Sequence, residues 1–587
     1  MKSLQYLNKY LWKYKWLFLL GVIFMVISNY FGVKMPIYVK ESIDQLLGET
    51  NIDSFEDGLW LSLKLGGIYM LLSFMKGLFL FFVRQTIIKM SRLIEYDLKN
   101  EIYLKYQKLD FAFLTKNSTG DLMNRISEDV SLVRMYLGPG IMYSVNLVIL
   151  ASMIIYQMVT ISPLLTLFTL VPLPIMSVLI FKVSKKMNLY SKETQEEQSN
   201  LSKLAQETFA GIRILKSYGA TAYKVDQFSK SSEDYKKKSM QLVLVNALFI
   251  PTMLLLIGTS TICTIYLGGL MNYDNQISLG GIIAFIFFVN NLTWPFASIG
   301  WVTSIVQRAE ASQKRINDFL KITSKIVNTS NNKLEKIDSI EFDGVQFIYE
   351  NTRIEAFKNV TFKIEKGQTV AFVGKTGSGK STILSLLTRL YDRNNGSIAI
   401  NGIDIKELNL YAYRESIGAV PQDVFLFSDT IKNNLLFGNP TKTTSLDDIQ
   451  KYTKLSHVHH SIEKFEKGYD TLLGERGVNL SGGQKQRITI ARALLKEPQL
   501  VLLDDCLSAV DTETEEIILQ NLRKYLSDKT CVMVSHRVST VKYADKIFYL
   551  DGGEIVESGS HTELLKAKGK YYKLHKDQLH DDENKFE

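Results

Sequence analysis

The stretch Gly374-Lys375-Thr376-Gly377-Ser378-Gly379-Lys380-Ser381-Thr382 fits the pattern G-x-x-x-x-G-K-[ST], which is typical of a loop that binds phosphate. A strand-like apolar run, 369–373, precedes it, and a helix-like run, 383–387, follows it. Glycines let such a loop bend until its backbone N–H groups converge on an anion, and the following helix adds the positive end of its dipole. We therefore predict a phosphate-binding loop between a buried strand and a helix.

Three side chains suit a nucleotide bound with Mg²⁺ at this loop. We predict that the Lys380 ammonium group reaches the β- and γ-phosphates and that the Ser381 hydroxyl ligates Mg²⁺. Upstream, Tyr349 is a candidate to stack on a purine base. The alternative for Tyr349 is an ordinary core or edge-strand aromatic residue.

Further candidates for the same site each follow an apolar run downstream. The Gln422 amide is a candidate ligand of Mg²⁺ or of the attacking water. Asp504 suits Mg²⁺, directly or through water, and Asp505 would stand where a water could be oriented for attack. His536 is a candidate sensor of the γ-phosphate.

A second phosphate-binding device is predicted at 480–484. Small residues open a helix there, and a helix N-terminus attracts anions. Its candidate contact residues are Ser481, Gly482, Gly483 and Gln484.

Length and composition indicate more than one domain and leave two classes of protein open. It has 587 residues, too many for one domain, and Lys and Arg exceed Asp and Glu by 69 to 60, giving a net charge of +9. Such a basic excess is typical of nucleic-acid binding or of the cytoplasmic loops of a membrane protein. The three cysteines have neither disulfide nor metal-ligand spacing.

The first half of the chain contains six apolar runs, each long enough to span a bilayer. An interfacial helix, 1–15, precedes them. The predicted spans are about 16–38, 59–83, 139–160, 164–183, 243–270 and 277–305. Six buried core helices are the alternative, and the charge pattern of the connections argues against it.

The connections orient these spans. The N-terminus and the long stretches 84–135 and 184–240 are rich in Lys and Arg, whereas the loop 40–57 is acidic. The positive-inside rule therefore places both termini and both long stretches in the cytoplasm. A break in each long stretch, at 111–120 and at 209–213, is a candidate tip that touches a soluble domain; an ordinary surface turn is the alternative.

A few polar residues within the predicted spans admit two interpretations. Lys64 and Lys76 either serve a function in the membrane or extend to its interface. Asn290, Asn291 and Trp294 either line a substrate path or hydrogen-bond between helices.

The second half is predicted to be an α/β phosphate-loop domain. We expect a six-helix transmembrane domain with long cytoplasmic extensions over 16–320, a linker over 321–336 and a nucleotide-binding domain with a helical subdomain over 337–577. A polar tail, 578–587, follows.

Together these motifs resemble those of ATP-binding cassette (ABC) exporter half-transporters, over essentially the whole chain. Several residues match motifs of that family: Tyr349 its adenine-stacking aromatic, Gly374–Thr382 its Walker A loop, Gln422 its Q-loop, Leu480–Gln484 its LSGGQ signature, Asp504 its Walker B aspartate, Ser508–Asp511 its D-loop and His536 its switch histidine. Glu475-Arg476-Gly477 is similar to the family's exporter-specific segment beside the coupling helices.

The resemblance implies ATP and Mg²⁺ as cofactors and a second half-transporter as partner. In the family, two cassettes enclose two ATP molecules, each between one chain's Walker A loop and the other's signature. A lipophilic, drug-like compound is the expected cargo, exported by alternating access, with lipid or peptide as alternatives and no nucleic acid. The expected location is a bacterial plasma membrane. A soluble cassette ATPase and an ATP-gated channel or regulatory subunit are the rival classes.

One position departs from the family pattern. The residue after the Walker B aspartate is usually Glu, and here it is Asp505. A side chain shorter by one carbon–carbon bond, about 1.5 Å, would hold the attacking water poorly. We therefore favour a heterodimer whose partner carries the catalytic Glu, with a homodimer in which Asp505 works as the alternative.

Overall fold

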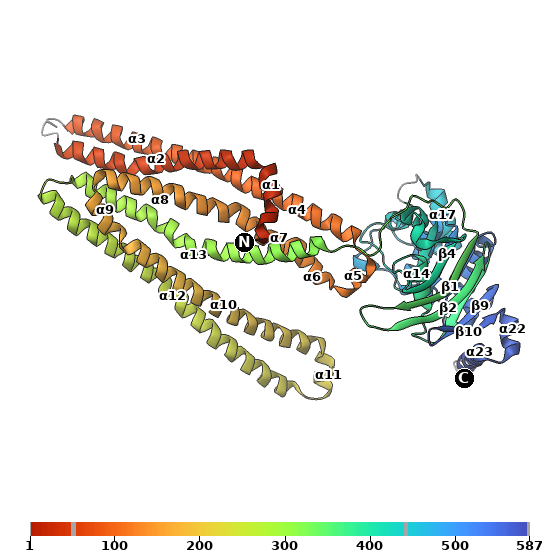
Figure 1. The fold of residues 1–587 in the computed structure, drawn as a ribbon. Helices are drawn as coiled ribbons and strands as arrows, with labels where there is room; N and C mark the ends of the chain where they lie inside the picture. The colour runs from red at the N-terminus through yellow and green to blue at the C-terminus, as the bar shows by residue number, and fades with distance from the viewer. Residues whose placement is uncertain (1, 49–54, 440–443, 584–587) are drawn as a thin grey trace. The chain divides into compact units, whose positions relative to one another are not determined.

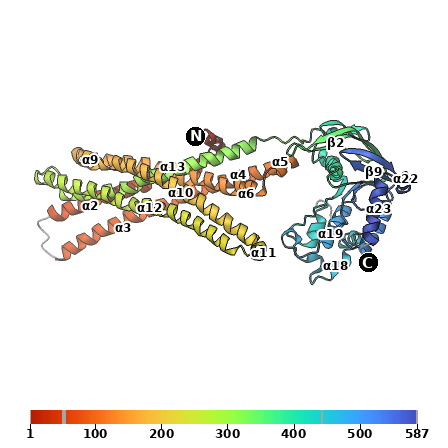
Figure 2. The same ribbon diagram turned by 90° about the horizontal axis from the view of Figure 1, so that it is seen from below.

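The computed structural model describes residues 2–48, 55–439 and 444–583. The chain divides into a helical unit, Met1–Gln107 with Thr119–Ile322, and an α/β unit, Lys108–Ser118 with Thr323–Glu587. Both are drawn in Figures 1 and 2.

Long helices make up the helical unit (Figure 1). In chain order they are η1 (Ser3–Leu7), α1 (Asn8–Lys13), α2 (Lys15–Gly48), α3 (Phe55–Val83), η2 (Arg84–Ile88), α4 (Lys89–Lys108), α6 (Thr119–Asn124), η3 (Arg125–Asp129), α7 (Val130–Met135), η4 (Tyr136–Gly140), α8 (Ile141–Ile161), α9 (Pro163–Leu170), α10 (Pro172–Ala210), α11 (Ile212–Ser217), α12 (Thr221–Tyr273) and α13 (Leu279–Lys321).

Within the described residues, five helical segments are long and apolar enough to cross a membrane. They are Lys15–Leu47, Leu59–Lys108, Thr119–Ile161, Thr221–Tyr273 and Leu279–Lys321. The remaining predicted span, 164–183, lies on α9 and the first part of α10, which are separated at Val171. Ser162 caps α9 by accepting from the Leu165 N–H, and Pro163 occupies the first turn, where its missing N–H costs nothing.

The predicted acidic loop, 40–57, is shorter than expected. Helix α2 continues through it to Gly48 and α3 begins at Phe55; residues 49–54 lie outside the described residues. One of its acids has a structural partner, because Asp44 accepts hydrogen bonds from the Ser278 hydroxyl at 2.8 Å and from the Gly280 N–H at 3.1 Å. Asp44 thereby holds the N-terminus of α13, where a carboxylate is favoured by the helix dipole.

Both predicted breaks in the long basic stretches are confirmed as interruptions of helix. Gly211 separates α10 from α11. The first break contains a short helix, α5 (Phe111–Lys116), which is capped by Asp110 and belongs to the α/β unit. Asp110 also accepts from the Lys325 N–H at 2.9 Å, and the Phe111 ring lies 5.8 Å from that of Tyr391.

Two sheets and a set of helices follow in the α/β unit. The strands are β1 (Ser339–Ile348), β2 (Glu355–Glu365), β3 (Thr369–Gly374), β4 (Asn395–Ile400), β5 (Ile403–Asp404), β6 (Ile417–Val420), β7 (Leu500–Asp504), β8 (Thr530–Val534), β9 (Lys546–Asp551) and β10 (Glu554–Gly559). The helices are α14 (Lys380–Leu387), η5 (Ile405–Glu407), α15 (Leu410–Glu415), α16 (Ile431–Leu436), α17 (Leu446–Leu455), α18 (His459–Glu463), η6 (Gly468–Asp470), η7 (Glu475–Gly477), α19 (Gly482–Leu495), α20 (Thr512–Tyr525), α21 (Val538–Val541), α22 (His561–Ala567) and α23 (Lys570–Glu583).

The larger sheet positions the site. Its order is β10-β9-β3-β8-β7-β6, and all neighbouring pairs are parallel except β10 with β9. The smaller antiparallel sheet has the order β2-β1-β4-β5. Strands β7 and β8 are buried along their whole length, as expected of parallel strands covered on both faces.

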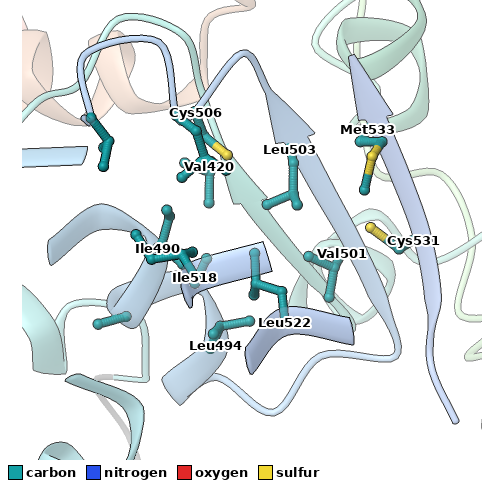
Figure 3. Close-up of a cluster of buried hydrophobic side chains, with 14 of the residues drawn as sticks. Val420, Ile490, Leu494, Val501, Leu503, Cys506, Ile518, Leu522, Cys531 and Met533 are labelled. Carbon is teal, nitrogen blue, oxygen red and sulfur yellow. The ribbon is translucent and has the colours of Figure 1, made fainter. Parts of the chain in front are cut away.

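Successive side chains of these strands enter different cores, because a strand alternates its faces. Ala371 and Val373 of β3 join one apolar cluster, whereas Val370 and Phe372 join the other. Figure 3 shows part of the first cluster, where β6, β7 and β8 meet α19 and α20. Its labelled residues are Val420, Ile490, Leu494, Val501, Leu503, Cys506, Ile518, Leu522, Cys531 and Met533.

The C-terminal helix runs across the predicted start of the polar tail. Helix α23 continues unbroken through 578–583. The reason is tertiary, because the Gln578 side chain accepts from the Val538 N–H at 2.8 Å and donates to the His536 carbonyl at 2.6 Å. Residues 584–587 of the predicted tail lie outside the described residues.

Candidate nucleotide-binding site

The predicted phosphate loop connects β3 to α14. Gly374 passes so close to β9 that a Cβ there would lie 2.2 Å from the Leu550 carbonyl oxygen. Gly379 has φ +97°, and a Cβ there would lie 2.8 Å from the Ala356 carbonyl oxygen. Any larger residue at either position would displace backbone, so this loop path requires glycine.

The Lys380 side chain turns back over the loop. Its ammonium group donates to the carbonyl oxygens of Gly374 at 2.9 Å and Lys375 at 2.8 Å. Burial lowers the pKa of Lys380, and the nearby carboxylates Asp505 and Asp504 oppose that shift. The cation is therefore held at the loop, where a bound anion would replace solvent as its counter-charge.

Next to the loop, Ser381 and Asp504 form an oxygen pair. The Ser381 hydroxyl donates to Asp504 Oδ1 at 2.9 Å. Asp504 is buried at the end of β7, and burial, together with the charge of Asp505, raises the pKa of its carboxyl group. Hard oxygen donors in this arrangement suit Mg²⁺, which keeps several waters or phosphate oxygens as its other ligands.

Asp505 and His536 meet because β7 and β8 are adjacent and end at the same edge of the sheet. Asp505 Oδ2 lies 3.0 Å from His536 Nδ1; the Asp505 side chain is 10% exposed and that of His536 is 53% exposed. Asp505 also has φ +45°, a conformation that Asp tolerates better than most residues. The carboxylate is thus fixed, and the imidazole faces outward.

Tyr349 lies partly buried at the side of the loop. Its hydroxyl is 2.9 Å from the Thr382 hydroxyl, and its ring packs edge-on against Phe347 at 4.8 Å and Tyr391 at 5.4 Å. It therefore belongs both to an aromatic cluster and to the lining of the site.

One cavity of about 320 Å³ brings most of the predicted site residues together. Its predicted lining residues are Tyr349, Thr376, Gly377, Gly379, Lys380, Ser381, Thr382, Gln422, Asp504, Asp505 and His536. Gly374, Lys375 and Ser378 of the loop are outside this lining. The Ser378 hydroxyl is buried without a hydrogen-bond partner in the described structure, so a polar group remains available inside the loop.

The second predicted phosphate-binding segment, 480–484, lies outside this cavity. Ser481 caps α19, accepting from the Gln484 N–H at 3.3 Å, while its own N–H donates to Gln484 Oε1 at 3.0 Å. Ser481 and Gly482 are exposed, and none of 481–484 lines the cavity of the same chain. Gln486 connects the helix to the segment after Asp505, since its amide donates to the Ser508 hydroxyl and accepts from the Ala509 N–H.

Sequence reasoning missed several contributors to the site. The cavity is also lined by Ile354, Ala356, Val534 and Ser535, and Gln578 holds the backbone on either side of Arg537. Ser535 had a sequence signal, because it stands beside His536 at the end of a strand-like run. Ile354 and Gln578 had none, because tertiary packing brings them there.

Comparison with known proteins identifies the family. The model described as "ABC transporter transmembrane region" matches residues 17–296, and the one described as "ABC transporter" matches residues 357–508. The chain belongs to the ABC transporter family. Its permease region is fused to its ATP-binding domain, the half-transporter arrangement, which implies that two such halves dimerise in a membrane.

Relatives extend over nearly the whole of this ABC transporter. It is 32% identical to the uncharacterized ABC transporter ATP-binding protein YknU of Bacillus subtilis (strain 168), over 99% of this chain and 98% of the relative. Identity is 35% to the multidrug resistance-like ATP-binding protein MdlA of Escherichia coli (strain K12), covering 82% and 81%. An ATP-dependent lipid A-core flippase of Syntrophus aciditrophicus (strain SB) is 31% identical, covering 96% and 92%.

The family makes the chain an integral membrane protein of the multidrug and lipid exporter type with an ATPase domain that binds ATP, normally with Mg²⁺. The residues present fit both groups. The loop encloses an unpartnered hydroxyl, and the Ser381–Asp504 pair supplies oxygen donors. A bound Mg²⁺ would offset phosphate charge at these oxygens.

Proposed function

We propose that this chain is one half of an ATP-driven exporter that moves a lipophilic, drug-like compound out of the cytoplasm across a bacterial plasma membrane. The observation that carries the proposal is the single cavity in which Lys380, Asp504 and His536 meet, in a chain whose other unit has membrane-crossing helices. Lipid or peptide is the alternative cargo. The basic cytoplasmic stretches support cytoplasmic N- and C-termini.

Each side chain at the cavity has a role that its position supports. Lys380 with the loop N–H groups would bind the β- and γ-phosphates, and Ser381, Gln422 and Asp504 would hold Mg²⁺ directly or through water. Asp505 would orient the attacking water, with His536 beside it toward the γ-phosphate. Tyr349 would stack on adenine.

The exposed signature requires a second chain. Ser481 and its neighbours are outside their own chain's cavity, so we infer that they complete the cavity of the partner. We propose a heterodimer, because Asp505 is one carbon–carbon bond, about 1.5 Å, shorter than the Glu usual at this position. The contact of Asp505 with His536 favours the second candidate, a homodimer in which Asp505 works with His536 beside it.

Alternating access needs a connection between nucleotide and membrane helices. Within the α/β unit, the Phe111 ring packs on Tyr391, and Tyr391 packs on Tyr349 at the cavity. We propose that this aromatic contact passes the closure around ATP to the tip 108–118. The tip near 209–213 would serve the partner chain's domain in the same way.

The proposal is tested with inside-out membrane vesicles containing this chain and its partner. ATP should drive uptake of a lipophilic dye against its gradient, and Lys380→Ala should abolish it. Lys366→Ala, which changes an exposed lysine paired with Asp338, is the control and should leave uptake unchanged. Dye movement that follows only its own gradient would instead indicate a channel.

The aromatic contact has its own test. Phe111→Ala should lower dye uptake severalfold while the protein still binds ATP. Leu114→Ala, on the same short helix, is the matched control. Equal uptake by both variants would contradict the role given to Phe111.

A further inference from the structure

A cavity of about 710 Å³ in the helical unit is a second candidate site. Its lining comes from α8, α10, α12 and α13, which are labelled in Figure 1. The volume lies within the range usual for small-molecule sites. None of its residues belongs to the nucleotide cavity.

One end of this cavity is apolar and aromatic. Trp294 and Trp301 line it from α13 and are 67% and 43% exposed. Tyr143 of α8 packs edge-on against Trp301 at 5.5 Å, and Met253 of α12 adds an unbranched apolar side chain. Large aromatic rings with accessible faces suit the chain or ring system of an amphiphile.

The other end is cationic. Arg308 lies 14 positions after Trp294 on α13 and therefore about 21 Å along the helix axis. Lys192 lines the cavity from α10. Lys192 lies beyond the end of the predicted apolar run 164–183, and Arg308 lies beyond the end of the run 277–305. Both tryptophans lie inside the run 277–305. The cavity thus crosses the boundary between bilayer core and polar surroundings.

Arg308 is available to a ligand. It makes no ion pair or hydrogen bond within the described part of the chain. Lys192 is partly neutralised by Glu196 at 3.7 Å, and both of those side chains are well exposed. No Asp or Glu is among the described residues that line the cavity. The polar end therefore carries a net positive charge.

Two simpler explanations for the tryptophan and basic side chains fit this cavity less well than an anion site does. Tryptophan and basic residues commonly anchor a helix at the membrane interface, but those side chains face lipid, whereas these line one cavity formed by four helices. The tryptophan faces could attract a cation, but a ring quadrupole attracts a cation less strongly than the unpaired charge of Arg308, together with Lys192, repels it. A cationic cargo would also find no carboxylate in the described lining.

We propose that this cavity binds the exported compound and selects anionic amphiphiles, with the apolar part on Trp294 and Trp301 and the carboxylate, sulfate or phosphate head on Arg308 and Lys192. The inference rests on the proposed export function and names the cargo class. Arg308 is the main anion ligand, because its planar guanidinium can donate two parallel hydrogen bonds to such a head group.

Two brominated probes that differ only in charge test this assignment. 9,10-Dibromostearate and its methyl ester have the same chain, and bromine quenches tryptophan fluorescence on contact. The dimer is studied in nanodiscs of neutral phosphatidylcholine, at a pH where the acid is ionised. We expect saturable quenching by the acid at about tenfold lower concentration than by the ester. The Trp294→Phe/Trp301→Phe variant should lose the saturable part.

Charge variants locate the anion ligand. Arg308→Gln with Lys192→Gln should weaken dibromostearate binding about tenfold and leave the ester unchanged. Arg308→Lys should retain most of the binding. Lys185→Gln with Lys186→Gln, two exposed lysines of α10 outside the cavity, is the matched control and should bind like the unaltered protein. Size-exclusion profiles and thermal unfolding establish that each variant is folded.

Adding phosphatidylglycerol to the nanodiscs identifies the source of the head group. Displacement of dibromostearate assigns the site to an anionic lipid, and continued binding assigns it to free anionic amphiphiles. Equal binding of acid and ester, or unchanged acid binding in Arg308→Gln/Lys192→Gln, would overturn the proposal. ATP-driven dye uptake is measured separately, so failure of the anion assignment is distinguishable from failure of the export function.

Discussion

The phosphate loop and the signature loop both present a helix N-terminus to a predicted phosphate, yet their surroundings differ. The phosphate loop lies at the end of β3, beside Asp504 of β7 and His536 after β8. The signature at Ser481 lies at the start of α19, exposed and outside that cavity. This difference supports the proposal that each helix N-terminus makes half a site and that a second chain supplies the other half.

The phosphate loop and the signature loop also differ in their electrostatic surroundings. The charges of Asp504 and Asp505 oppose the lowering of the Lys380 pKa by burial, and the charge of Asp505 adds to the effect of burial in raising the pKa of Asp504. The signature is held by its capping hydrogen bonds, by a hydrogen bond from the Arg487 side chain to the Gly483 carbonyl and by the contact of Gln486 with the segment 508–509. We accordingly expect substitutions at the phosphate loop to affect chemistry in this chain, and those at the signature to act on the partner.

The largest effect is expected at Lys380. Lys380→Ala should abolish ATP hydrolysis at the site built on this chain, because the cation at the loop is lost while no membrane helix is altered. Phosphate release by the purified dimer and membrane insertion are measured together. Normal turnover by a dimer with this change in every chain would refute the assignment of the loop.

Asp505 is the next position by expected size of effect. Positioning of a general base contributes about 10²–10⁴-fold, so Asp505→Glu should accelerate a slow site severalfold or more. Asp505→Asn should have a lower rate of ATP turnover than the unaltered chain. Turnover is measured with this chain alone and with its partner.

The result at Asp505 also decides between the two kinds of dimer. Robust turnover by the unaltered chain alone, lost in Asp505→Asn, would overturn the heterodimer. Because residue 505 has φ +45° and Glu tolerates this conformation less well than Asp, thermal unfolding of Asp505→Glu has to be compared with that of the unaltered chain.

Ser481 tests the other side of the comparison. Ser481→Ala should reduce nucleotide labelling of the partner chain about tenfold, since a hydrogen bond to a charged group contributes about 1.5–3 kcal/mol. Photoaffinity labelling with azido-ATP, followed by separation of the two chains, measures each site. Labelling of this chain should remain.

Ser445 provides the matched control. It also caps a helix, α17, at an exposed N-terminus and through a capping box, so Ser445→Ala loses a comparable cap of about 0.5–2 kcal/mol without touching the signature. A fall in the labelling of this chain, rather than the partner, on Ser481→Ala would refute the two-half-site interpretation.

Tyr349 gives the smallest expected effect. Tyr349→Ala should weaken ATP binding by about 1–3 kcal/mol, the usual contribution of stacking on a base. Tyr349→Phe retains the ring and loses only the hydroxyl contact with Thr382, so it should bind nearly as the unaltered protein does. Equal ATP dissociation constants for Tyr349→Ala and the unaltered chain would make Tyr349 a core aromatic residue only.

The amino-acid sequence determined the local chemistry of the protein. The spacing from Gly374 to Thr382 requires a strand before it and a helix after it, and the structure has β3 and α14 there. Apolar runs and charged connections likewise indicate a membrane unit, because the bilayer imposes a minimum length of apolar helix. Such patterns depend only on residues that are close in sequence, so they can be identified without knowledge of the tertiary structure.

Only the tertiary structure decided which distant residues meet. It placed His536 against Asp505, Gln578 against the His536 backbone and Phe111 against Tyr391. It also extended α23 past residue 577 and brought Arg308 and Trp294 into one cavity. These contacts depend on strand order and on helix packing between segments far apart in the chain, which hydrophobic periodicity and motif spacing do not encode.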